Sequence, residues 1–272
     1  MSRIETDPAV ASGSRPISAE RRTAGVRDIR AWDLGWNDAA VPAAVLISYD
    51  VEAFDVAAFA SHGIAMPTNI ERSVKKRQAE FFMGRLAAGD AVRALMEVGR
   101  DQPSPMDRLL PSWGPQIGTG ASREPLWPDG MVGSISHAGR YAAAVAAGAP
   151  GLRGIGIDIE CLIGAETRQS VEDTVLKPVE KALLHALVDE VSYEMLLTIA
   201  FSAKESFYKG SFATVGTFFD FDAVRITGVD APNGTIHIVL ERSLAPELPQ
   251  GRPFTLHTGF IDATTVFTSF VW

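Results

Sequence analysis

Apolar residues along the first half of this chain recur at spacings that predict both strands and helices. A short apolar and partly β-branched run at residues 43–49 predicts a buried strand. Residues 70–98 follow a helical spacing and predict one long helix. Residues 131–136 predict another strand, and the alanine-rich stretch that begins near Tyr141 predicts a helix.

The second half continues this mixture. Residues 154–160 alternate apolar and polar positions, which predicts a strand with one buried face. Residues 179–209 predict a helix in two pieces that meet near residues 190–193. Asn233-Gly234 lies between two runs rich in Thr, Val, Phe and Ile, and this dipeptide is typical of a β-hairpin. Residues 99–130 hold six prolines and predict a long irregular connection, which is often functional.

Composition limits the classes of protein that fit. The 272 residues make one large domain or two of about 135 residues, and 46% of them are hydrophobic, enough for a core. The single cysteine excludes a disulfide framework and a Cys-rich zinc site. A net charge of −8 excludes a global attraction to nucleic acid or to anionic membranes. Without a long apolar stretch or a secretory apolar region, we expect no membrane span and a cytoplasmic location.

The strand at residues 154–160 carries two carboxylates on one face. Successive side chains of a strand point to opposite sides, so the three isoleucines share a core face, and Asp158 and Glu160 share the other with two glycines. The carboxylates then stand roughly 7 Å apart beside a surface without side chains. This arrangement suits Mg²⁺ with a bulky anionic ligand lying on the glycines. A solvated acidic face is the alternative.

The segment at residues 201–209 combines opposite charges with aromatic residues. Glu205 and Lys209 are four residues apart and share a helix face, which usually indicates a surface ion pair. Phe201, Phe207 and Tyr208 indicate instead that the segment is mostly buried. Burying both charges is costly unless a metal or a phosphate compensates them, which favours a functional site.

Three further segments predict anion binding. Ser136-His137 enters a glycine-flanked turn; no nucleophile elbow is present, so a turn that binds an anion through the hydroxyl, an imidazolium and backbone N–H groups is favoured over a hydrolase triad. Arg77 and Arg85 lie about 12 Å apart along a helix and about 80° apart around it, so both can reach one large anion; a solvated basic face is the alternative. Arg123 is another candidate, with Glu124-Pro125 fixing its turn.

Taken in this order, these segments resemble the 4′-phosphopantetheinyl transferase superfamily, and best its monomeric two-lobed branch that serves siderophore and peptide synthetases. One departure is Phe201, where many relatives carry Trp. The stretches that carry the resemblance are 75–85, 123–128, 133–141, 154–160 and 201–209.

The resemblance implies an α+β fold of two similar lobes related by a pseudo-twofold, with coenzyme A in the cleft between them. We expect a flexible N-terminal tail at residues 1–28, an N-terminal lobe at 29–135 and a C-terminal lobe with the metal site at 136–272. The family pattern also implies a monomer.

The resemblance further implies how the site residues divide their roles. Asp158, Glu160 and Glu205 would hold Mg²⁺ together with the coenzyme A pyrophosphate. Glu205 would act, directly or through water, as base for a serine hydroxyl of the carrier protein, and Lys209 would stabilise or protonate the leaving adenosine 3′,5′-bisphosphate. The residues expected at coenzyme A are Arg77, Arg85, Arg123, Glu124, Pro125, Ser136, His137, Asp158, Glu205 and Lys209.

The activity implied is Mg²⁺-dependent transfer of the 4′-phosphopantetheine arm of coenzyme A to an apo acyl, peptidyl or aryl carrier protein, with coenzyme A as donor substrate. Two alternatives stay open. One is a Mg²⁺-dependent pyrophosphohydrolase of coenzyme A or a related nucleotide, and the other is a non-catalytic coenzyme A-binding module. The carrier protein, its docking surface and the pathway do not follow from the sequence.

Overall fold

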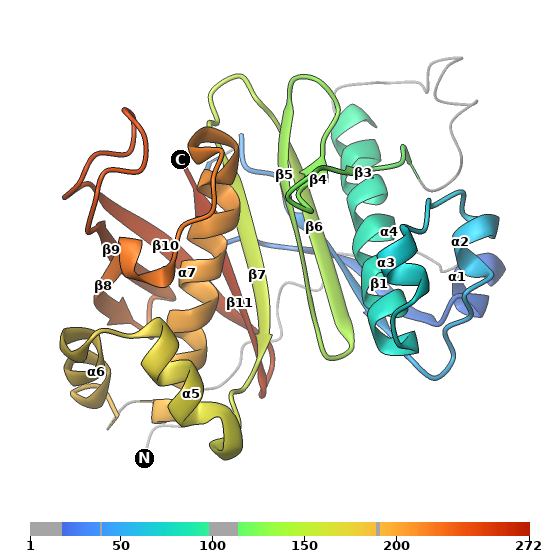
Figure 1. Ribbon diagram of the computed structural model, residues 1–272. Helices are drawn as coiled ribbons and strands as arrows, with labels where there is room; N and C mark the ends of the chain where they lie inside the picture. The colour runs from blue at the N-terminus through green and yellow to red at the C-terminus, as the bar shows by residue number, and fades with distance from the viewer. Residues whose placement is uncertain (1–17, 39, 98–113, 189–190) are drawn as a thin grey trace.

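The computed structural model describes residues 18–38, 40–97, 114–188 and 191–272. Two antiparallel sheets lie face to face, and one long helix covers the outer face of each (Figure 1). The layers therefore follow the order helix, sheet, sheet, helix. No helix in the described ranges is long and apolar enough to cross a membrane.

The first sheet has the strand order β1-β2-β6-β5 and packs against helix α4. Its strands are β1 (Val26–Trp32), β2 (Ala44–Tyr49), β6 (Tyr141–Gly148) and β5 (Met131–Ala138). The helices on this side are α1 (Ala19–Thr23), α2 (Ala58–Ser61), α3 (Thr68–Glu71) and α4 (Lys75–Glu97). A small hairpin of β3 (Gly118–Thr119) and β4 (Pro125–Leu126) lies beside them.

The second sheet has the strand order β7-β11-β10-β9-β8 and packs against helix α7. Its strands are β7 (Ile155–Cys161), β11 (Thr265–Val271), β10 (Pro253–Asp262), β9 (Thr235–Leu240) and β8 (Val224–Asp230). The helices on this side are α5 (Ala165–Val175), α6 (Pro178–His185), α7 (Tyr193–Val215) and the short η1 (Phe221–Ala223).

Three apolar cores hold the layers together. Phe82 of α4 lies in the core that also contains Ala142, Ala144 and Ala146 of β6. Between the two sheets, the isoleucines of β7 pack against Leu46 and Val145. Phe207 of α7 packs on Phe270 of β11, with ring centroids 4.9 Å apart. Each long helix is thus fixed to its sheet by aromatic and aliphatic burial, the dominant favourable term in folding.

Most of the predicted elements are confirmed, with one clear error. The strands near residues 43–49, 131–136 and 154–160, the two-piece helix and the Asn233-Gly234 hairpin are all present. The helix expected from Tyr141 is wrong, because this stretch forms strand β6. Residues 142–147 are at most 2% exposed, and a strand buried on both faces reads as one continuous apolar run.

Two boundaries differ from those expected. The helix predicted over 70–98 divides, with α3 ending at Glu71 and α4 beginning at Lys75. The lobe boundary expected between residues 135 and 136 falls inside β5, and the whole β5–β6 hairpin belongs to the first sheet. Of the expected tail, residues 1–17 lie outside the described residues, while 18–28 contain α1 and the start of β1. Residues 99–113 of the proline-rich connection also lie outside them.

Candidate functional site

Strand β7 has the predicted isoleucine face and the predicted face of glycines and carboxylates, but helix α7 covers the glycines. A Cβ atom at Gly156 would lie 1.9 Å from the carbonyl oxygen of Ser206, and one at Gly154 would lie 1.8 Å from that of Gly210. The backbone of α7 therefore rests directly on these glycines. The expectation that a bulky anionic ligand lies on them is wrong, since the helix already fills that space.

This close approach brings Asp158 against Lys209. Asp158 is 2% exposed, and its Oδ1 accepts a hydrogen bond from Lys209 Nζ at 2.6 Å. The Ser136 hydroxyl donates to the same oxygen at 2.9 Å. Asp158 Oδ2 is buried and has no hydrogen-bond partner in the described part of the chain. One carboxylate oxygen is thus fixed and the other remains available for a ligand.

Strand β5 supplies this junction with two serine hydroxyls. Ser136 Oγ accepts the backbone N–H of Ile159 at 3.0 Å and a hydrogen bond from Lys209 at 3.1 Å. Ser134 Oγ accepts the N–H of Ile157 at 3.0 Å in the same way. The edges of the two sheets therefore meet along β5 and β7, which lie side by side in the middle of the molecule (Figure 1). The sequence patterns gave no sign of the role of Ser134.

Glu160 and Glu205 add two half-buried carboxyl groups beside Asp158. The pKa of Glu160 is raised to about 8, chiefly by burial and then by the charge of Asp158; Lys209 opposes the rise and Glu205 adds to it. Burial also raises the pKa of Glu205, with Lys209 opposing and Asp158 adding to the rise. The three predicted acidic residues are therefore close enough to repel one another.

The donor chemistry of this cluster fits a hard divalent cation, although the ligands are not assembled around one point. Within the described ranges, no three or more His, Cys, Asp or Glu side chains are grouped so that they could hold a metal ion as they stand. Coordination to Mg²⁺ would nevertheless give the unpartnered Oδ2 of Asp158 a partner, and the charge of the cation would reduce the repulsion among the carboxyl groups.

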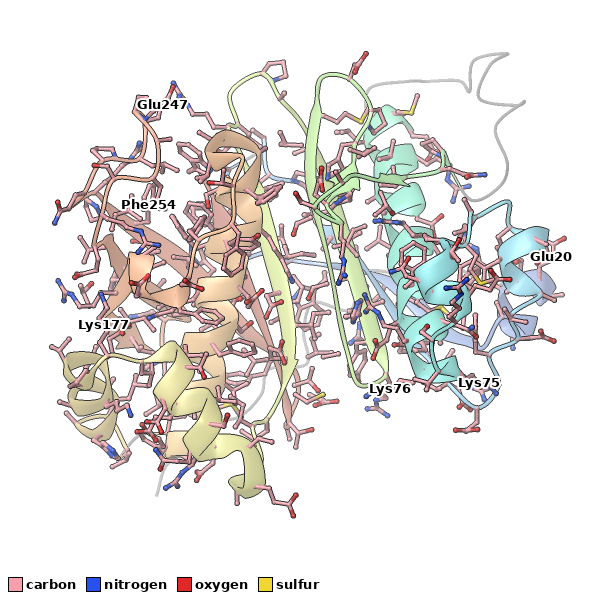
Figure 2. The ribbon with its side chains drawn as sticks, in the orientation of Figure 1. Glu20, Lys75, Lys76, Lys177, Glu247 and Phe254 are labelled. Carbon is pink, nitrogen blue, oxygen red and sulfur yellow. The ribbon has the colours of Figure 1, made fainter. Side chains whose placement is uncertain are left out.

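Arg77 and His137 meet at the start of α4. Arg77 Nη1 lies 2.9 Å from His137 Nε2, and Glu80 lies within 3.4 Å of Arg77 and 3.8 Å of His137. Burial lowers the pKa of His137, so the ring is neutral near pH 7 and accepts a hydrogen from Arg77. Burial therefore disfavours the imidazolium that the sequence led us to expect here. Lys75 and Lys76 lie at the same end of α4, at its lower end in Figure 2.

Arg85 takes a different set of partners from Arg77. Its guanidinium donates to Thr119 Oγ1 at 2.7 Å and lies 4.9 Å from the Phe81 ring centroid. Its Nε is buried and unpartnered among the described residues. Burial lowers its pKa to about 10, so the group is charged at neutral pH. A buried cation with a free N–H is suited to an anionic ligand.

Arg123 occupies the turn between β3 and β4 in a strained conformation. Its φ of 69° is the only positive value among the described non-glycine residues. The turn is closed by the hydrogen bond from Arg123 N to Gly120 O at 3.1 Å, and Pro125 begins β4. One carboxylate oxygen of Glu124 is buried without a partner in the part of the chain described. Strained residues of this kind cluster at functional sites.

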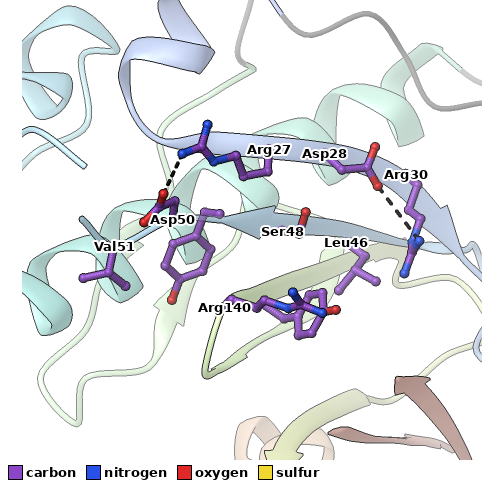
Figure 3. Close-up of a pocket in the computed structure, with 10 residues that line it drawn as sticks. Arg27, Asp28, Arg30, Leu46, Ser48, Asp50, Val51 and Arg140 are labelled. Carbon is purple, nitrogen blue, oxygen red and sulfur yellow. Dashed lines mark hydrogen bonds and ion pairs between the residues drawn. The ribbon is translucent and has the colours of Figure 1, made fainter. Parts of the chain in front are cut away.

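A separate pocket of about 510 Å³ lies on the first sheet. It is lined by β1, β2 and the turn between β5 and β6, and it contains Arg27, Arg30 and Arg140 (Figure 3). Arg27 is paired with Asp50 at 2.5 Å. None of the predicted site residues lines this pocket, so it is distinct from the Asp158 cluster.

Two family models match the chain. A model of the 4′-phosphopantetheinyl transferase N-terminal domain matches residues 66–147, and a model of the 4′-phosphopantetheinyl transferase superfamily matches residues 154–252. The first match ends within β6 and the second begins just before β7. Together they include every predicted site residue.

Individual relatives agree with the models. Enterobactin synthase component D of Salmonella typhi is 34% identical over 189 residues, covering 68% of this chain and 71% of that protein. The 4′-phosphopantetheinyl transferase Npt of Nocardia iowensis is 32% identical over 174 residues, covering 62% and 69%. A crystal structure of holo-ACP-synthase from Plasmodium yoelii matches with a TM-score of 0.30 and 19% identity, over 44% of this chain and 93% of that one, which is too low to support an inference. The chain belongs to the 4′-phosphopantetheinyl transferase superfamily and is an enzyme of that transferase class.

Proposed function

We propose that this enzyme transfers the 4′-phosphopantetheine arm of coenzyme A to a serine hydroxyl of an apo carrier protein and releases adenosine 3′,5′-bisphosphate. The observation that carries the proposal is the cluster at the β5–β7 junction, where Lys209, Asp158 and Ser136 are in direct contact beside Glu205. It offers a proton acceptor, a cation and an unpartnered carboxylate oxygen within one site.

In this reaction the serine oxygen forms a bond to the phosphorus that carries the pantetheine arm, and the bond from that phosphorus to the bridging oxygen of the pyrophosphate breaks. Glu205 takes the serine proton, directly or through water; its raised pKa suits a base that works near neutral pH. The Lys209 ammonium stabilises the charge that develops on the leaving bisphosphate. Positioning and charge neutralisation therefore do most of the catalytic work.

Mg²⁺ would be held by Asp158, Glu160 and Glu205 together with the pyrophosphate. When bound, it would neutralise the phosphate charge and orient the reacting oxygens. The buried, unpartnered Oδ2 of Asp158 supports this assignment, as does the raised pKa of Glu160, since a cation would relieve the repulsion among the carboxylates.

The basic residues of α4 and of the β3–β4 turn would bind the phosphates of coenzyme A. Arg77 is positioned by His137, and Arg85 keeps an unpartnered buried N–H among the described groups. Arg123 is held in a costly left-handed conformation, which supports a role for its side chain, with Glu124 and Pro125 shaping the turn. Arg suits this task because its fork can donate two parallel hydrogen bonds to one phosphate.

We propose that the two helix-on-sheet halves are the two lobes, related by a pseudo-twofold, and that coenzyme A lies between them. Each half has its own antiparallel sheet and its own 23-residue helix, which is α4 in the first half and α7 in the second. We place the division in the connection between β6 and β7. Relatives named as enterobactin synthase components support carrier proteins of siderophore or peptide synthetases as acceptors.

The test is to incubate the protein with coenzyme A, Mg²⁺ and apo carrier proteins, and to measure the intact mass of each carrier. A gain of one phosphopantetheine group supports the transferase. Release of 4′-phosphopantetheine with an unmodified carrier would indicate the pyrophosphohydrolase, and binding of coenzyme A without any product would indicate the non-catalytic module.

A further inference from the structure

Three buried hydroxyl groups connect α7 to the second sheet. Ser202 Oγ lies 2.8 Å and Ser206 Oγ lies 2.5 Å from Thr268 Oγ1, and all three side chains are inaccessible to solvent. The two serines are four residues apart and so share one face of α7. Thr268 therefore bridges two successive turns of the helix from a single position on β11.

The helix face that these serines define is the face that rests on the sheet. Gly210, four residues after Ser206, continues it and lies against Gly154 and Gly156. Glu205 precedes Ser206 and Lys209 precedes Gly210, so the two charged residues are offset from this contact face by one residue each. The rotation of α7 on the sheet consequently decides where both charged groups lie.

Thr268 is also the direct neighbour of Asp158. The two residues are paired across the antiparallel β7–β11 ladder, and paired residues of adjacent strands present their side chains on the same face. The hydroxyl that fixes the helix thus stands beside the carboxylate that contacts Lys209. Thr268 therefore connects α7, which carries Glu205 and Lys209, with Asp158 of β7.

We propose that Thr268 is a positioning residue for the transfer reaction. Its hydroxyl, shared by Ser202 and Ser206, sets the rotation of α7 and thereby holds Glu205 and Lys209 in register with Asp158. The proposal rests on the proposed function, because it concerns the same catalytic groups.

Apolar packing alone does not fix this rotation. The contacts of Phe207 with Phe270 are non-directional, and glycines permit close approach without choosing an angle. Hydrogen bonds are directional and weaken steeply when they are bent, so the Thr268 hydroxyl restricts the rotation of the helix. Loss of that hydroxyl need not unfold the protein, because serines inside a helix can donate to the carbonyl four residues earlier.

The test compares Thr268→Val, which removes only the hydroxyl, with Ser269→Ala on the same strand. Ser269 is equally buried, but it faces the other way, donating to Leu34 O at 2.7 Å and accepting from Trp36 Nε1 at 2.9 Å. Both variants lose a buried hydroxyl, and the control does not touch α7. For each protein, kcat and KM for a carrier protein, the Kd of coenzyme A by calorimetry and the melting temperature are measured.

We expect Thr268→Val to lower kcat by at least about tenfold, since a misplacement of 1 Å can cost up to about 10²-fold. The Kd of coenzyme A should change by a smaller factor, because the arginines that would bind its phosphates lie on α4 and in the β3–β4 turn and not on α7. Its melting temperature should resemble that of Ser269→Ala, and Thr268→Ser should restore kcat. If Thr268→Val does not fold, Ser206→Ala removes the same contact from the helix side.

A kcat for Thr268→Val within about twofold of that of Ser269→Ala would overturn the proposal and leave the proposed function intact. The tenfold loss of kcat that we expect corresponds to about 1.4 kcal/mol of activation free energy. Equal loss of kcat in Thr268→Val and Thr268→Ser would overturn it as well, because the serine keeps the hydroxyl. Failure of the parent protein to modify any carrier would overturn the proposed function itself.

Discussion

The close packing of α7 on Gly156 leaves no room for a side chain at this backbone position of the site. A Cβ atom there would lie 1.9 Å from Ser206 O, 2.5 Å from Gly210 N and 3.0 Å from Gly210 Cα. All three are backbone atoms of the helix, so no side chain can move aside to accept the methyl group. A carbon–oxygen contact needs about 3.3 Å, so Gly156→Ala must displace α7 by more than about 1 Å.

This displacement should reduce both stability and activity. Overpacking of a filled interior costs about 1–3 kcal/mol of unfolding free energy. The Lys209–Asp158 contact, 2.6 Å in the parent, would lengthen beyond hydrogen-bond distance. A misplacement of about 1 Å can cost about 10²-fold in rate, and we therefore expect kcat for carrier modification to fall by about that factor.

Gly259→Ala is the matched control, since Gly259 lies in β10 and a Cβ there has nothing within 4 Å. Urea titration gives the free energy of unfolding of both variants, and intact-mass assays of a carrier protein give kcat. If Gly156→Ala unfolds at the same urea concentration as Gly259→Ala and keeps its kcat within about twofold, the close contact of α7 with the strand does not hold the catalytic groups.

Buried and strained groups give three more expected outcomes. Lys204→Met should lower the free energy of unfolding by about 3–5 kcal/mol in urea titrations, because it leaves the Glu180 carboxylate buried without its cation 2.8 Å away; a loss below about 1 kcal/mol would contradict this. Arg123→Gly should weaken coenzyme A binding in calorimetry, and unchanged affinity would refute the role of the Arg123 side chain. The free energy of unfolding should change by less than about 1 kcal/mol, because glycine relieves the left-handed strain but also loses more backbone entropy on folding. The melting temperature should fall as pH rises from about 5 to about 8, since the pKa of Glu160 is about 8 in the folded protein and ordinary in the unfolded chain; an equal slope in Glu160→Gln would assign that fall to other groups.

Sequence patterns predicted much of the fold because local spacing decides it. The alternation at residues 154–160 and the hairpin at Asn233-Gly234 each depend on neighbouring residues only. The alanine-rich stretch after Tyr141 misled the prediction, because alanine favours helices in isolation and tertiary burial between α4 and the second sheet overrides that preference.

Sequence patterns singled out residues that meet at the β5–β7 junction, but they did not predict how these residues pack. The contact of Lys209 with Asp158, 51 residues apart, depends on how α7 lies on β7. A face of glycines is equally compatible with a bound ligand and with a helix backbone, and no local pattern distinguishes the two. The neutral state of His137 likewise depends on burial beside Arg77 and Glu80, which become its neighbours only in the fold.

The serines of β5 have a consequence for the way in which the two sheets are joined. β7 is an edge strand of its sheet, and an edge with free N–H groups is a template for pairing with another chain. Ser134 and Ser136 occupy the N–H groups of Ile157 and Ile159, so this edge is blocked by side chains that also support the catalytic site. Loss of Ser136 would therefore leave the buried N–H of Ile159 without its partner as well as an impaired site, and a loss of stability would be expected to accompany the loss of activity.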